Sequence, residues 1–282
     1  MKLLSIIIVN YNNPELLAAC LKSIYQHLAG IKKEIIVVDN NSTLQNLPKH
    51  QERYPDLKVI YSKVNKGFGC ANNLGVKNAT GDILLLLNSD TEFIDNSFEV
   101  MLESFCALPY KEIWGPRLIW PDGKFQLSYS KEISFIDFLT NYTSLYPFMK
   151  ILHLAKGHKY KYEEFVSQTE VGVIYGTAML MNKCVYEKLC GFSQKYFMYF
   201  EDVDLCDRFR KELGGRIKFD PTTTLIHRVK GSSEGFYMNL KYTTRSKYIY
   251  SISKFGYLAT IVILPIDFIF WAITSLLRKA KS

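Results

Sequence analysis

The strongest structural signal in the sequence is Gly81-Asp82-Ile83-Leu84-Leu85-Leu86-Leu87-Asn88-Ser89-Asp90-Thr91. Five aliphatic residues in a row lie between a turn glycine and a polar cluster. The run is too short to span a membrane and too uniformly apolar for a strand with one face in water. It predicts a central strand of a parallel sheet, covered on both faces by helices.

Three polar residues, Asn88, Ser89 and Asp90, follow this strand directly. The ligand crevice of an open α/β sheet lies outside the carboxyl ends of its strands, so these side chains are expected at its floor. A carboxylate there can hold a divalent metal that bridges a diphosphate, because Mg²⁺ commonly takes one or two protein carboxylates together with phosphate oxygens. The alternative is that Asp90 only caps a helix that begins near Asp95.

The composition describes a globular protein on the apolar side. Of the 282 residues, 48% are hydrophobic and 22% are charged, which argues against disorder and allows one large domain or two small ones. The six cysteines include no Cys-x-x-Cys pair, and no apolar signal peptide precedes the first strand. This pattern predicts reduced thiols in a cytosolic chain instead of a disulfide framework or a zinc site.

The net charge of +8 is concentrated in the last quarter of the chain. Residues 208–254 hold eleven Lys or Arg against three Asp or Glu, whereas residues 1–207 carry a small negative charge. A basic segment that leads into an apolar tail is attracted to an anionic membrane surface, by about 1 kcal/mol per Lys or Arg near the lipid. Nucleic acid binding would instead require base-stacking aromatic residues interleaved with the charges. We therefore expect a membrane partner and no nucleic acid.

Earlier strands also end in polar loops. Residues 3–9 form an aliphatic run that is followed by Asn10-Tyr11-Asn12-Asn13-Pro14, and residues 34–38 form another that is followed by Asp39-Asn40-Asn41-Ser42. An acid after the second strand commonly hydrogen-bonds the ribose or base of a nucleotide. The alternative is a helix cap, a role that Ser42 can fill alone, which would leave Asp39 free for a ligand.

A glycine-rich loop, residues 65–75, connects a short third strand to the next helix. Its glycines allow a ligand to approach the backbone, and the helix N-terminus that follows favours phosphate. One such loop is weak support. Its repetition among four strand–helix units, whose polar loops would meet along one edge of the sheet, makes a nucleotide pocket the preferred interpretation.

The middle of the chain changes to strands and turns, beginning with residues 114–118. Residues 131–166 show no convincing period and predict a partly helical excursion over the active face, where it would contact an acceptor. Residues 171–181 return as a strand interrupted by glycine. Its second glycine, Gly176, is expected where a ligand approaches closely.

An aromatic run then leads into an acidic cluster, Glu201-Asp202-Val203-Asp204-Leu205-Cys206-Asp207. Acids in the first turn of a helix are favoured by the helix dipole, which is a purely structural explanation. The alternative is that the aromatic walls exclude water and raise the proton affinity of one carboxylate, which would make it a general base. The residues alone leave both explanations open.

Residues 218–221 and 225–228 predict a closing strand pair that ends at His227. A lone histidine is more often a structural residue than a ligand. Its position after the last strand nevertheless makes His227 a candidate second protein ligand for the metal.

The tail from Tyr257 to Leu277 is long enough to cross a bilayer. However, Pro265 interrupts it, and Thr260, Asp267 and Thr274 recur every seven residues as a narrow polar stripe. The pattern predicts membrane attachment without spanning, with the basic residues after Leu277 anchoring headgroups. The alternative is an ordinary packed pair of C-terminal helices.

Taken together, these motifs resemble the family 2 glycosyltransferases of the GT-A fold, most closely their bacterial rhamnosyltransferase-like branch. The likeness covers about residues 3–250. It is carried by several ordered motifs: Ser5–Asn12, Val37–Ser42, Asn65–Asn73, Leu87–Asp90, Gly191-Phe192, Phe197–Arg208 and His227.

The resemblance implies an α/β fold of the GT-A type, with a mostly parallel central sheet flanked by helices. The catalytic domain would cover residues 1–250, with a nucleotide-binding half in residues 1–110 and an acceptor-binding half in residues 111–250. Residues 251–282 would form a helical, membrane-associating tail. The implied metal is Mn²⁺ or Mg²⁺, and the implied site residues are Tyr11, Asn12, Asp39, Asn65, Gly67, Asn73 and Ser89 for the nucleotide, Asp90 and His227 for the metal, and Asp202 as the base with Glu201 beside it.

Two departures from the family pattern qualify this resemblance. Asn88 occupies the place of the first acid of the metal motif, which leaves the metal with one fewer charged ligand. No Gln-x-x-Arg-Trp motif is present, which implies transfer of a single sugar.

The implied reaction is inverting transfer from a nucleotide-diphosphate sugar, dTDP-rhamnose or a UDP-sugar, to a saccharide or polyprenyl-diphosphate-linked acceptor. It would serve cell-surface polysaccharide synthesis, as lipopolysaccharide O-antigen or capsule, at the cytoplasmic face of the bacterial inner membrane. One alternative is a sugar nucleotidyltransferase, which would require a glycine-rich basic loop in place of residues 10–12. The other is a non-catalytic basic membrane-binding module. A glycosidase would need two carboxylates flanking the bond and no nucleotide pocket.

Overall fold

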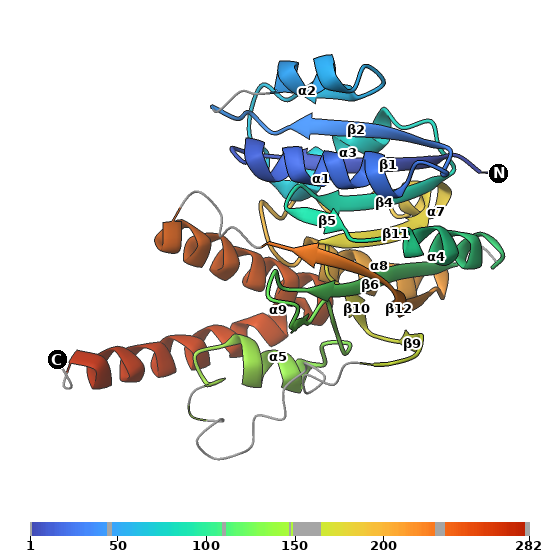
Figure 1. Ribbon diagram of the computed structural model, residues 1–282. Helices are drawn as coiled ribbons and strands as arrows, with labels where there is room; N and C mark the ends of the chain where they lie inside the picture. The colour runs from blue at the N-terminus through green and yellow to red at the C-terminus, as the bar shows by residue number, and fades with distance from the viewer. Residues whose placement is uncertain are drawn as a thin grey trace.

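A mixed sheet of ten strands forms the centre of the computed structural model, which describes residues 2–43, 47–108, 111–146, 148, 165–228 and 235–279 (Figure 1). The strands in the described ranges are β1 Leu4–Asn10, β2 Lys33–Asp39, β3 Lys58–Tyr61, β4 Ile83–Asn88, β5 Thr91–Phe93, β6 Glu112–Ile119, β7 Phe125–Gln126, β8 Tyr129–Ser130, β9 Thr169–Glu170, β10 Val173–Ile174, β11 Ala178–Asn182 and β12 Arg216–His227. The helices are α1 Pro14–His27, α2 Leu47–Arg53, α3 Phe68–Lys77, α4 Ser97–Cys106, α5 Phe135–Tyr142, α7 Lys183–Lys188, α8 Glu201–Leu213 and α9 Gly235–Lys279.

The predicted central position of the aliphatic strand is confirmed. The main path of the sheet has the order β3-β2-β1-β4-β11-β6-β12-β5, and β4 lies in its middle. The first four strands of the path are parallel, whereas β11 runs antiparallel to both β4 and β6. Six of the ten described strands of this sheet therefore run in one direction, and β11, β5, β7 and β9 run in the other.

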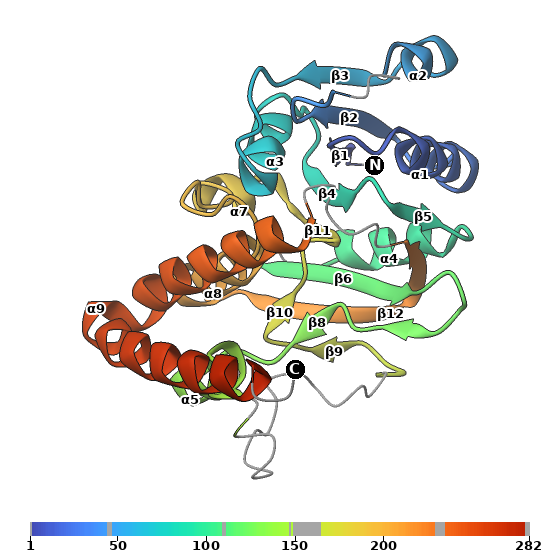
Figure 2. The same cartoon turned by 90° about the vertical axis from the view of Figure 1, so that its left-hand side faces the viewer.

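Both faces of β4 are buried, which explains its uninterrupted aliphatic sequence. Leu84 and Leu86 belong to one hydrophobic core, and Ile83, Leu85 and Leu87 belong to a second core on the opposite face. Helices α3, α7 and α8 lie on one side of the sheet and α1 and α4 on the other (Figure 2). Because side chains alternate between the faces of a strand, a strand covered on both sides needs an apolar residue at every position.

Two predicted strands differ from the structure. The strand predicted over residues 171–181 is divided at Gly176 into β10, which pairs with β8 in a small separate sheet, and β11 in the main sheet. The predicted closing strand pair is wrong, since β12 is one strand whose pairing with β6 shifts register between Asp220 and Thr224. An irregularity of this kind absorbs extra residues within one strand, so the turn-like Pro221 does not end it.

Within residues 131–166, the predicted helical content is α5. Its first turn carries a capping box, in which Ser134 accepts a hydrogen bond from the Asp137 backbone and the Asp137 carboxylate accepts one from the Ser134 backbone. Residues 147 and 149–164 lie outside the described residues.

The C-terminal helix α9 is a hairpin of two arms. Gly256 has a left-handed φ of 85° and separates a first arm, residues 235–255, from a second arm, residues 257–279. The two arms project from the sheet (Figure 1). The boundary predicted between residues 250 and 251 falls inside the first arm.

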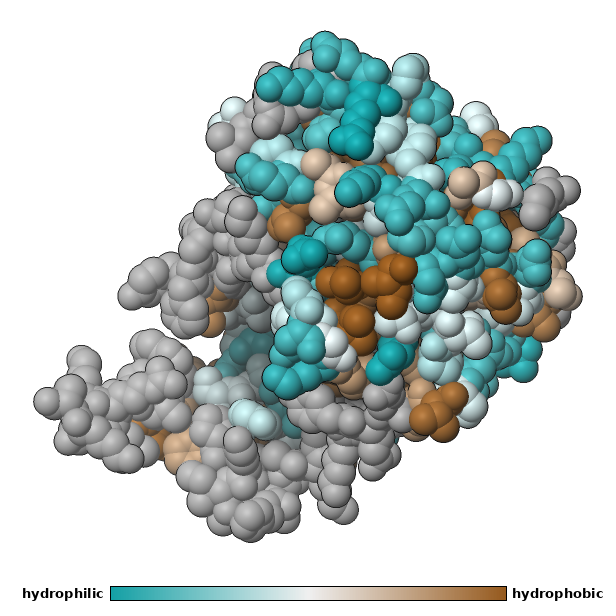
Figure 3. Space-filling view, in the orientation of Figure 1, coloured by the Kyte–Doolittle hydropathy of each residue, from teal (hydrophilic) through white to brown (hydrophobic). Residues whose placement is uncertain are grey.

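Two residues of the predicted polar stripe, Thr260 and Asp267, face the first arm, and the side chain of the third, Thr274, lies outside the described residues. Thr260 lies 2.9 Å from the Ser251 hydroxyl, and the Asp267 carboxylate accepts a hydrogen bond from Lys247. The outer face of the second arm exposes large apolar side chains: Tyr257, Leu258, Ile261, Val262, Leu264, Phe268, Ile269 and Ile273. By contrast, most of the surface over the sheet in Figure 3 is hydrophilic.

Candidate active site

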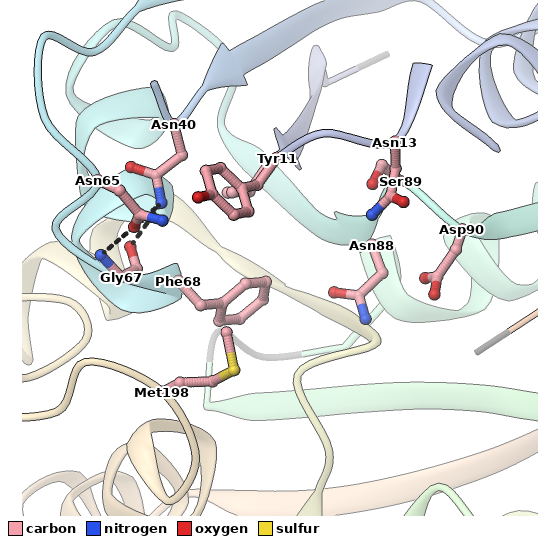
Figure 4. A pocket seen from close by; sticks show the side chains of 11 residues that line it. Tyr11, Asn13, Asn40, Asn65, Gly67, Phe68, Asn88, Ser89, Asp90 and Met198 are labelled. Carbon is pink, nitrogen blue, oxygen red and sulfur yellow. Dashed lines mark hydrogen bonds between the residues drawn. The ribbon is translucent and has the colours of Figure 1, made fainter. Parts of the chain in front are cut away.

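A pocket of about 160 Å³ opens at the carboxyl ends of the parallel strands. Its walls come from the loops after β1, β2 and β4, the entrance of α3 and the turn before α8 (Figure 4). The lining residues are Val9, Tyr11, Asn13, Asn40, Asn65, Gly67, Phe68, Asn88, Ser89, Asp90 and Met198. We call it the strand-end pocket.

The glycine loop of this pocket packs directly on the turn before α8. Gly67 has a φ of 91°, and a Cβ atom at this position would lie 1.9 Å from the carbonyl oxygen of Phe197. The next residue, Phe68, donates its backbone N–H to the same oxygen at 3.0 Å. Asn65 accepts hydrogen bonds from Asn40 at 2.8 Å and from the Gly67 backbone at 2.9 Å. Glycine is therefore required for both its conformation and its lack of a side chain.

Asp90 and His227 meet at one end of the strand-end pocket. The antiparallel pairing of β5 with β12 sets Thr91 opposite His227, and the Arg228 backbone donates to the Asp90 carbonyl at 2.9 Å. Asp90 Oδ1 consequently lies 3.2 Å from His227 Nε2. The alternative role of Asp90 as a helix cap is wrong, because β5 follows it and Asn96 is the N-cap of α4.

The chemistry of this pair fits a divalent metal. His227 Nδ1 lies 3.0 Å from the carbonyl oxygen of the Gln126 side chain, which can accept a hydrogen bond from Nδ1–H and so leave the lone pair of Nε2 for a cation shared with Asp90. Carboxylate oxygen and neutral imidazole nitrogen are both ligands for Mn²⁺-like cations. Within the described ranges, no group of three or more His, Cys, Asp or Glu side chains could hold a metal. A cation here would therefore take its remaining ligands from water or a diphosphate.

Asp202 is held at the start of α8 by a tight turn. Tyr199 and Phe200 both have left-handed backbone conformations, with φ of 71° and 68°, and α8 begins at the next residue. Such conformations cost of order 1–3 kcal/mol each and are common at functional sites. Asp202 accepts hydrogen bonds from the Gly176 backbone at 2.9 Å and the Val203 backbone at 2.8 Å.

A second pocket, of about 430 Å³, lies beside the first and contains Asp202. Its lining is Asn141, Tyr142, Tyr175, Tyr199, Phe200, Glu201, Asp202, Val203 and Thr243, and we call it the tyrosine pocket. Gly176 joins the two pockets. A Cβ atom on Gly176 would lie 3.1 Å from the ring of Phe68 in the strand-end pocket and 3.7 Å from the Cβ of Asp202.

Burial changes the acidity of both carboxyls at the start of α8. It raises the pKa of Asp202, although the backbone hydrogen bonds from Gly176 and Val203 oppose the change. Burial raises the pKa of Glu201 as well, and the neighbouring charge of Asp202 adds to the effect. Glu201 Oε2 is buried without a hydrogen-bond partner. Both carboxyls are therefore weaker acids than in water, and the backbone hydrogen bonds from Gly176 and Val203 favour the ionised form of Asp202.

Comparison with protein families identifies the chain. The family model described as glycosyl transferase family 2 matches residues 5–190, which include the strand-end pocket up to Asp90. The chain belongs to glycosyl transferase family 2.

Curated relatives of this family 2 chain include two biosynthetic glycosyltransferases. An N-acetylglucosaminyl-diphospho-decaprenol L-rhamnosyltransferase of Mycobacterium tuberculosis is 26% identical over 204 residues, which cover 68% of this chain and 66% of the relative. A low-salt glycan biosynthesis hexosyltransferase, Agl10 of Haloferax volcanii, is 26% identical over 215 residues, 74% of this chain and 62% of the relative. The chain thus spans less than two thirds of the length of these relatives.

Solved structures with the same fold include two glycosyltransferases. GalNAc-T7 with UDP, GalNAc and Mn²⁺ has a TM-score of 0.66 at 14% identity, covering 89% of this chain and 48% of that one. The mannosyltransferase PcManGT of Pyrobaculum calidifontis, with GDP-Man and Mn²⁺, has a TM-score of 0.58 at 17% identity, covering 97% and 75%. At these identities the likeness establishes the GT-A fold, as predicted from the sequence.

The residues predicted for the nucleotide site of the family 2 chain divide into two groups. Tyr11, Asn65, Gly67 and Ser89 line the strand-end pocket, together with Asp90 of the metal pair. Asn12, Asp39 and Asn73 are absent from its lining.

Asn73 and Asn12 have structural partners instead. Asn73 donates to the Phe192 carbonyl at 2.8 Å and accepts from the Phe192 backbone at 3.0 Å, so it fastens α3 to the Gly191-Phe192 turn. Asn12 accepts a hydrogen bond from the Thr43 backbone at 2.8 Å and ties two loops together. Neither residue lines the strand-end pocket, because loop-to-loop contacts use their polar groups, and their predicted contact with a nucleotide stays a prediction.

The side chain of Asp39 is expected from the sequence to be free for a ligand, but both of its oxygens accept hydrogen bonds within the protein. Its Oδ1 accepts from Asn10 at 3.2 Å and its Oδ2 from the Ser42 backbone at 3.0 Å. Ser42 also accepts a hydrogen bond from the Asn12 backbone at 2.9 Å. Asp39 therefore organises the loop behind the strand-end pocket, and any contact with a nucleotide would have to share these oxygens.

The other acids of the α8 cluster are structural. Asp204 pairs with Arg208 at 2.8 Å and accepts from the Tyr196 hydroxyl at 3.3 Å. Asp207 accepts from the Tyr250 hydroxyl at 2.6 Å and from Lys254 at 2.9 Å, both on the first arm of α9. Structural contacts thus account for Asp204 and Asp207, and the general-base explanation for Asp202 stays a prediction.

Several residues around the two pockets were not singled out from the sequence: Asn13, Asn40, Phe68, Met198, Tyr142, Tyr175, Tyr199, Thr243 and Gln126. Asn40 and Phe68 are adjacent to predicted residues, so a wider reading of the same loops would have included them. Met198 and Gln126 carry no local signal, because only the folded chain brings them to the site.

Proposed function

We propose that this family 2 chain transfers a single sugar, with inversion, from a nucleotide-diphosphate donor to a saccharide or a polyprenyl-diphosphate-linked acceptor. The donor is dTDP-rhamnose or a UDP-sugar, and the product enters cell-surface polysaccharide synthesis at the cytoplasmic face of a bacterial inner membrane. The contact around Gly176 carries the proposal, because it sets Asp202 between a pocket suited to the donor and a pocket suited to the acceptor.

The strand-end pocket is the proposed donor site. Its amide side chains and the Tyr11 ring suit a nucleotide, and Asn65, Gly67 and Ser89 complete the wall. Asp90 and His227 are the proposed metal ligands. A divalent cation bound there would offset the negative charge that grows on the leaving diphosphate. A sugar nucleotidyltransferase is less well supported, since Asn10-Tyr11-Asn12 follow β1 in place of a basic glycine loop.

Asp202 is the proposed general base. It removes the proton from an acceptor hydroxyl while that oxygen forms a bond to the anomeric carbon and the bond from this carbon to the diphosphate oxygen breaks. The raised pKa of Asp202 strengthens it as a base once it is ionised. Glu201, buried beside it with a raised pKa, stays neutral over a wider pH range and so limits the negative charge at the reaction centre.

The tyrosine pocket is the proposed acceptor site. Tyr142, Tyr175 and Tyr199 offer aromatic rings and hydroxyls to a sugar, and Asp202 lies in the same wall. Thr243 brings the first arm of α9 into this lining. The proposed acceptor site is therefore built partly by the element whose second arm exposes an apolar face.

That apolar face is the proposed contact with an anionic membrane. Residues 240–270 are long enough to cross a bilayer and contain an 18-residue stretch with a mean hydropathy of 1.6, but Gly256 turns the chain inside this segment. Asp267, near the middle of the second arm, is bonded to the first arm and not exposed. An arm with one apolar side and a satisfied polar side is suited to lie in the interface.

A panel of nucleotide sugars tests the donor site. dTDP-rhamnose, UDP-galactose and UDP-N-acetylglucosamine are added with and without Mn²⁺, and thermal unfolding is followed. A donor at one hundred times its Kd stabilises the folded state by about 2.7 kcal/mol. We expect one donor to raise the unfolding temperature, with a larger effect when Mn²⁺ is present. If none does so, the proposed donor site is wrong.

The base is tested with Asp202→Asn and the donor found in this way. A synthetic polyprenyl-diphosphate N-acetylglucosamine serves as acceptor. Asp202→Asn should lose transfer while keeping the donor-induced stabilisation, and Asp82→Asn, an exposed acid at the opposite end of β4, should behave as wild type. Near wild-type turnover by Asp202→Asn would show that the base is another group.

The proposed membrane contact is tested by placing a charged residue on the apolar face of the second arm. Ile261→Glu or Ile269→Glu should abolish sedimentation with phosphatidylglycerol vesicles, because each residue is more than half exposed there. Val100→Glu, equally exposed on α4, is the matched control and should sediment as wild type. Equal sedimentation of all variants would place the contact elsewhere.

A further inference from the structure

Gln126 lies behind His227 on the side away from Asp90. It is the last residue of β7, which pairs with β6 so that Gln126 is opposite Leu118. On the other side of β6, Leu118 is opposite Leu225 of β12. Since side chains alternate along a strand, Gln126, Leu118, Leu225 and His227 belong to the same face of the sheet. Gln126 therefore reaches across β6 toward the histidine.

The contact offers an acceptor to one of the two imidazole nitrogens. The Gln126 side-chain carbonyl oxygen lies 3.0 Å from His227 Nδ1 and can accept a hydrogen bond from it when Nδ1 carries the proton. Without a cation, Nε2–H can donate to Asp90 Oδ1, 3.2 Å away, and Gln126 then turns its amide N–H to Nδ1. A cation bound between Nε2 and Asp90 excludes that proton, so the proton moves to Nδ1 and the Gln126 carbonyl accepts its hydrogen bond.

We infer that Gln126 is a positioning residue, which accepts a hydrogen bond from Nδ1–H of His227 when a divalent cation binds between Nε2 and Asp90 and thereby stabilises the metal-binding tautomer. The inference rests on the metal site of the proposed function and adds the group that prepares it. The partner of the second nitrogen commonly fixes the tautomer and ring orientation of a metal-binding histidine, and its loss typically weakens metal binding by about 10–100-fold.

The tautomer is measured with and without the diamagnetic cation Mg²⁺. Histidine labelled with ¹⁵N is examined by long-range ¹⁵N–¹H correlation at a pH where imidazole is neutral, and the His227 signals are assigned by their loss in His227→Asn. On addition of Mg²⁺ we expect wild type and Gln126→Glu, which keeps an acceptor, to change from the Nε2–H form to the Nδ1–H form. At the same Mg²⁺ concentration Gln126→Leu should keep the Nε2–H form, while Gln26→Leu, an exposed glutamine on α1, should change as wild type does. The same change in Gln126→Leu as in wild type would overturn the inference.

Mn²⁺ binding, followed by electron paramagnetic resonance, gives the second readout. Gln126→Leu should raise the Kd for Mn²⁺ at least tenfold, and Gln126→Glu should restore it at least to the wild-type value. If Gln126→Leu binds Mn²⁺ as wild type while Asp90→Asn does not, the metal site stands and the role of Gln126 is refuted. If Asp90→Asn and His227→Asn also bind as wild type, the metal site of the proposed function is refuted. A fold check by circular dichroism accompanies each variant.

Discussion

Asp267 is expected to hold the two arms of α9 together. Its carboxylate is 5% exposed and accepts hydrogen bonds from the Ser144 backbone at 2.6 Å, from Lys247 at 2.5 Å and from the Tyr248 hydroxyl at 2.5 Å. Burial alone would raise its pKa, yet these bonds lower the pKa of Asp267 from 3.8 to about 2. The three donors therefore stabilise the ionised form by more than burial destabilises it.

The size of the effect follows from two estimates. A lowering of nearly two pKa units, at about 1.4 kcal/mol per unit, corresponds to about 2–3 kcal/mol. Removing one partner of a buried ion pair costs about 3–5 kcal/mol, because the other charge is left unpaired. We therefore expect Asp267→Ala to destabilise the α9 hairpin by about 3 kcal/mol, which corresponds to about a hundredfold faster amide exchange in the second arm.

Hydrogen–deuterium exchange in residues 257–270 measures this loss, with Asp95→Ala, an exposed acid beyond β5, as the control. Lys247→Met combined with Asp267→Leu should lose less than the sum of the two single changes, since no charge is left unpaired. In wild type, the stabilisation by Asp267 is present above the unfolded pKa of about 4 and disappears as the pH falls toward 2. Unchanged exchange in Asp267→Ala would refute this reasoning.

Three further predictions concern the two pockets. Because burial raises the pKa of Asp202, kcat/KM should fall with decreasing pH through a value above about 4, and an acid limb at or below that pH would contradict the assignment. The raised pKa of Glu201 means that the folded state keeps a proton which the unfolded chain loses, so its contribution weakens as the pH rises. Glu201→Gln should thus unfold at a higher temperature than wild type at pH 8 and at the same temperature at pH 4; calorimetry at both values decides. Gly67→Ala, whose Cβ would lie 1.9 Å from the Phe197 carbonyl, should lose donor-induced thermal stabilisation, whereas Gly123→Ala has a φ of 82° but no atom within 4 Å and should retain it.

The sequence predicted the parts of the fold that depend on local pattern. Leu84, Leu85 and Leu86 alternate between two cores, so their uniform apolarity is a direct consequence of burial on both faces. The polar residues after β1 and β4 reach the strand-end pocket because parallel strands bring their carboxyl ends to one edge. Neither conclusion requires knowledge of distant pairings.

Other features of the fold depend on strand pairings and side-chain partners that no local sequence pattern predicts. The reversal of β11 and the continuity of β12 through Asp220 are set by neighbouring strands. Asn73 is of a residue type that commonly binds ligands, but its side chain is hydrogen-bonded to the backbone of Phe192, more than a hundred positions away in the sequence. Gln126 belongs to a two-residue strand with no pattern of its own. Polar residues in loops are thus predictable as a class, while the partner of each one is not.

The tail is the clearest case of this limit. High hydropathy distinguishes residues 257–277 from the rest of the chain, so the sequence predicts a boundary between the domain and the tail at residue 250. In the structure the first arm of α9 crosses this boundary and contacts the domain. The first arm contacts the turn before α8: Ser246 donates to the Met198 carbonyl at 2.7 Å, and the rings of Tyr242 and Phe197 are 4.4 Å apart. The first arm is harder to recognise from hydropathy, because an amphipathic helix that packs on a domain has a lower mean hydropathy than an apolar helix.

These contacts make the apolar arm continuous with the proposed reaction centre. The second arm bonds to the first through Asp267 and Lys247, the first arm bonds to Met198, and Met198 lines the strand-end pocket two residues before the left-handed Phe200. A chain that ended near Lys254 would leave Lys247 without its carboxylate, and the loss of that buried pair alone would loosen the turn that carries Asp202. Loss of transfer in such a chain would therefore reflect the unpaired Lys247 before it reflected any loss of membrane contact. Ile261→Glu changes only the outer face and leaves the Lys247–Asp267 pair intact. If Ile261→Glu still transferred the sugar to an acceptor in solution but not to an acceptor in vesicles, the membrane would act by delivering the acceptor and not by holding the turn.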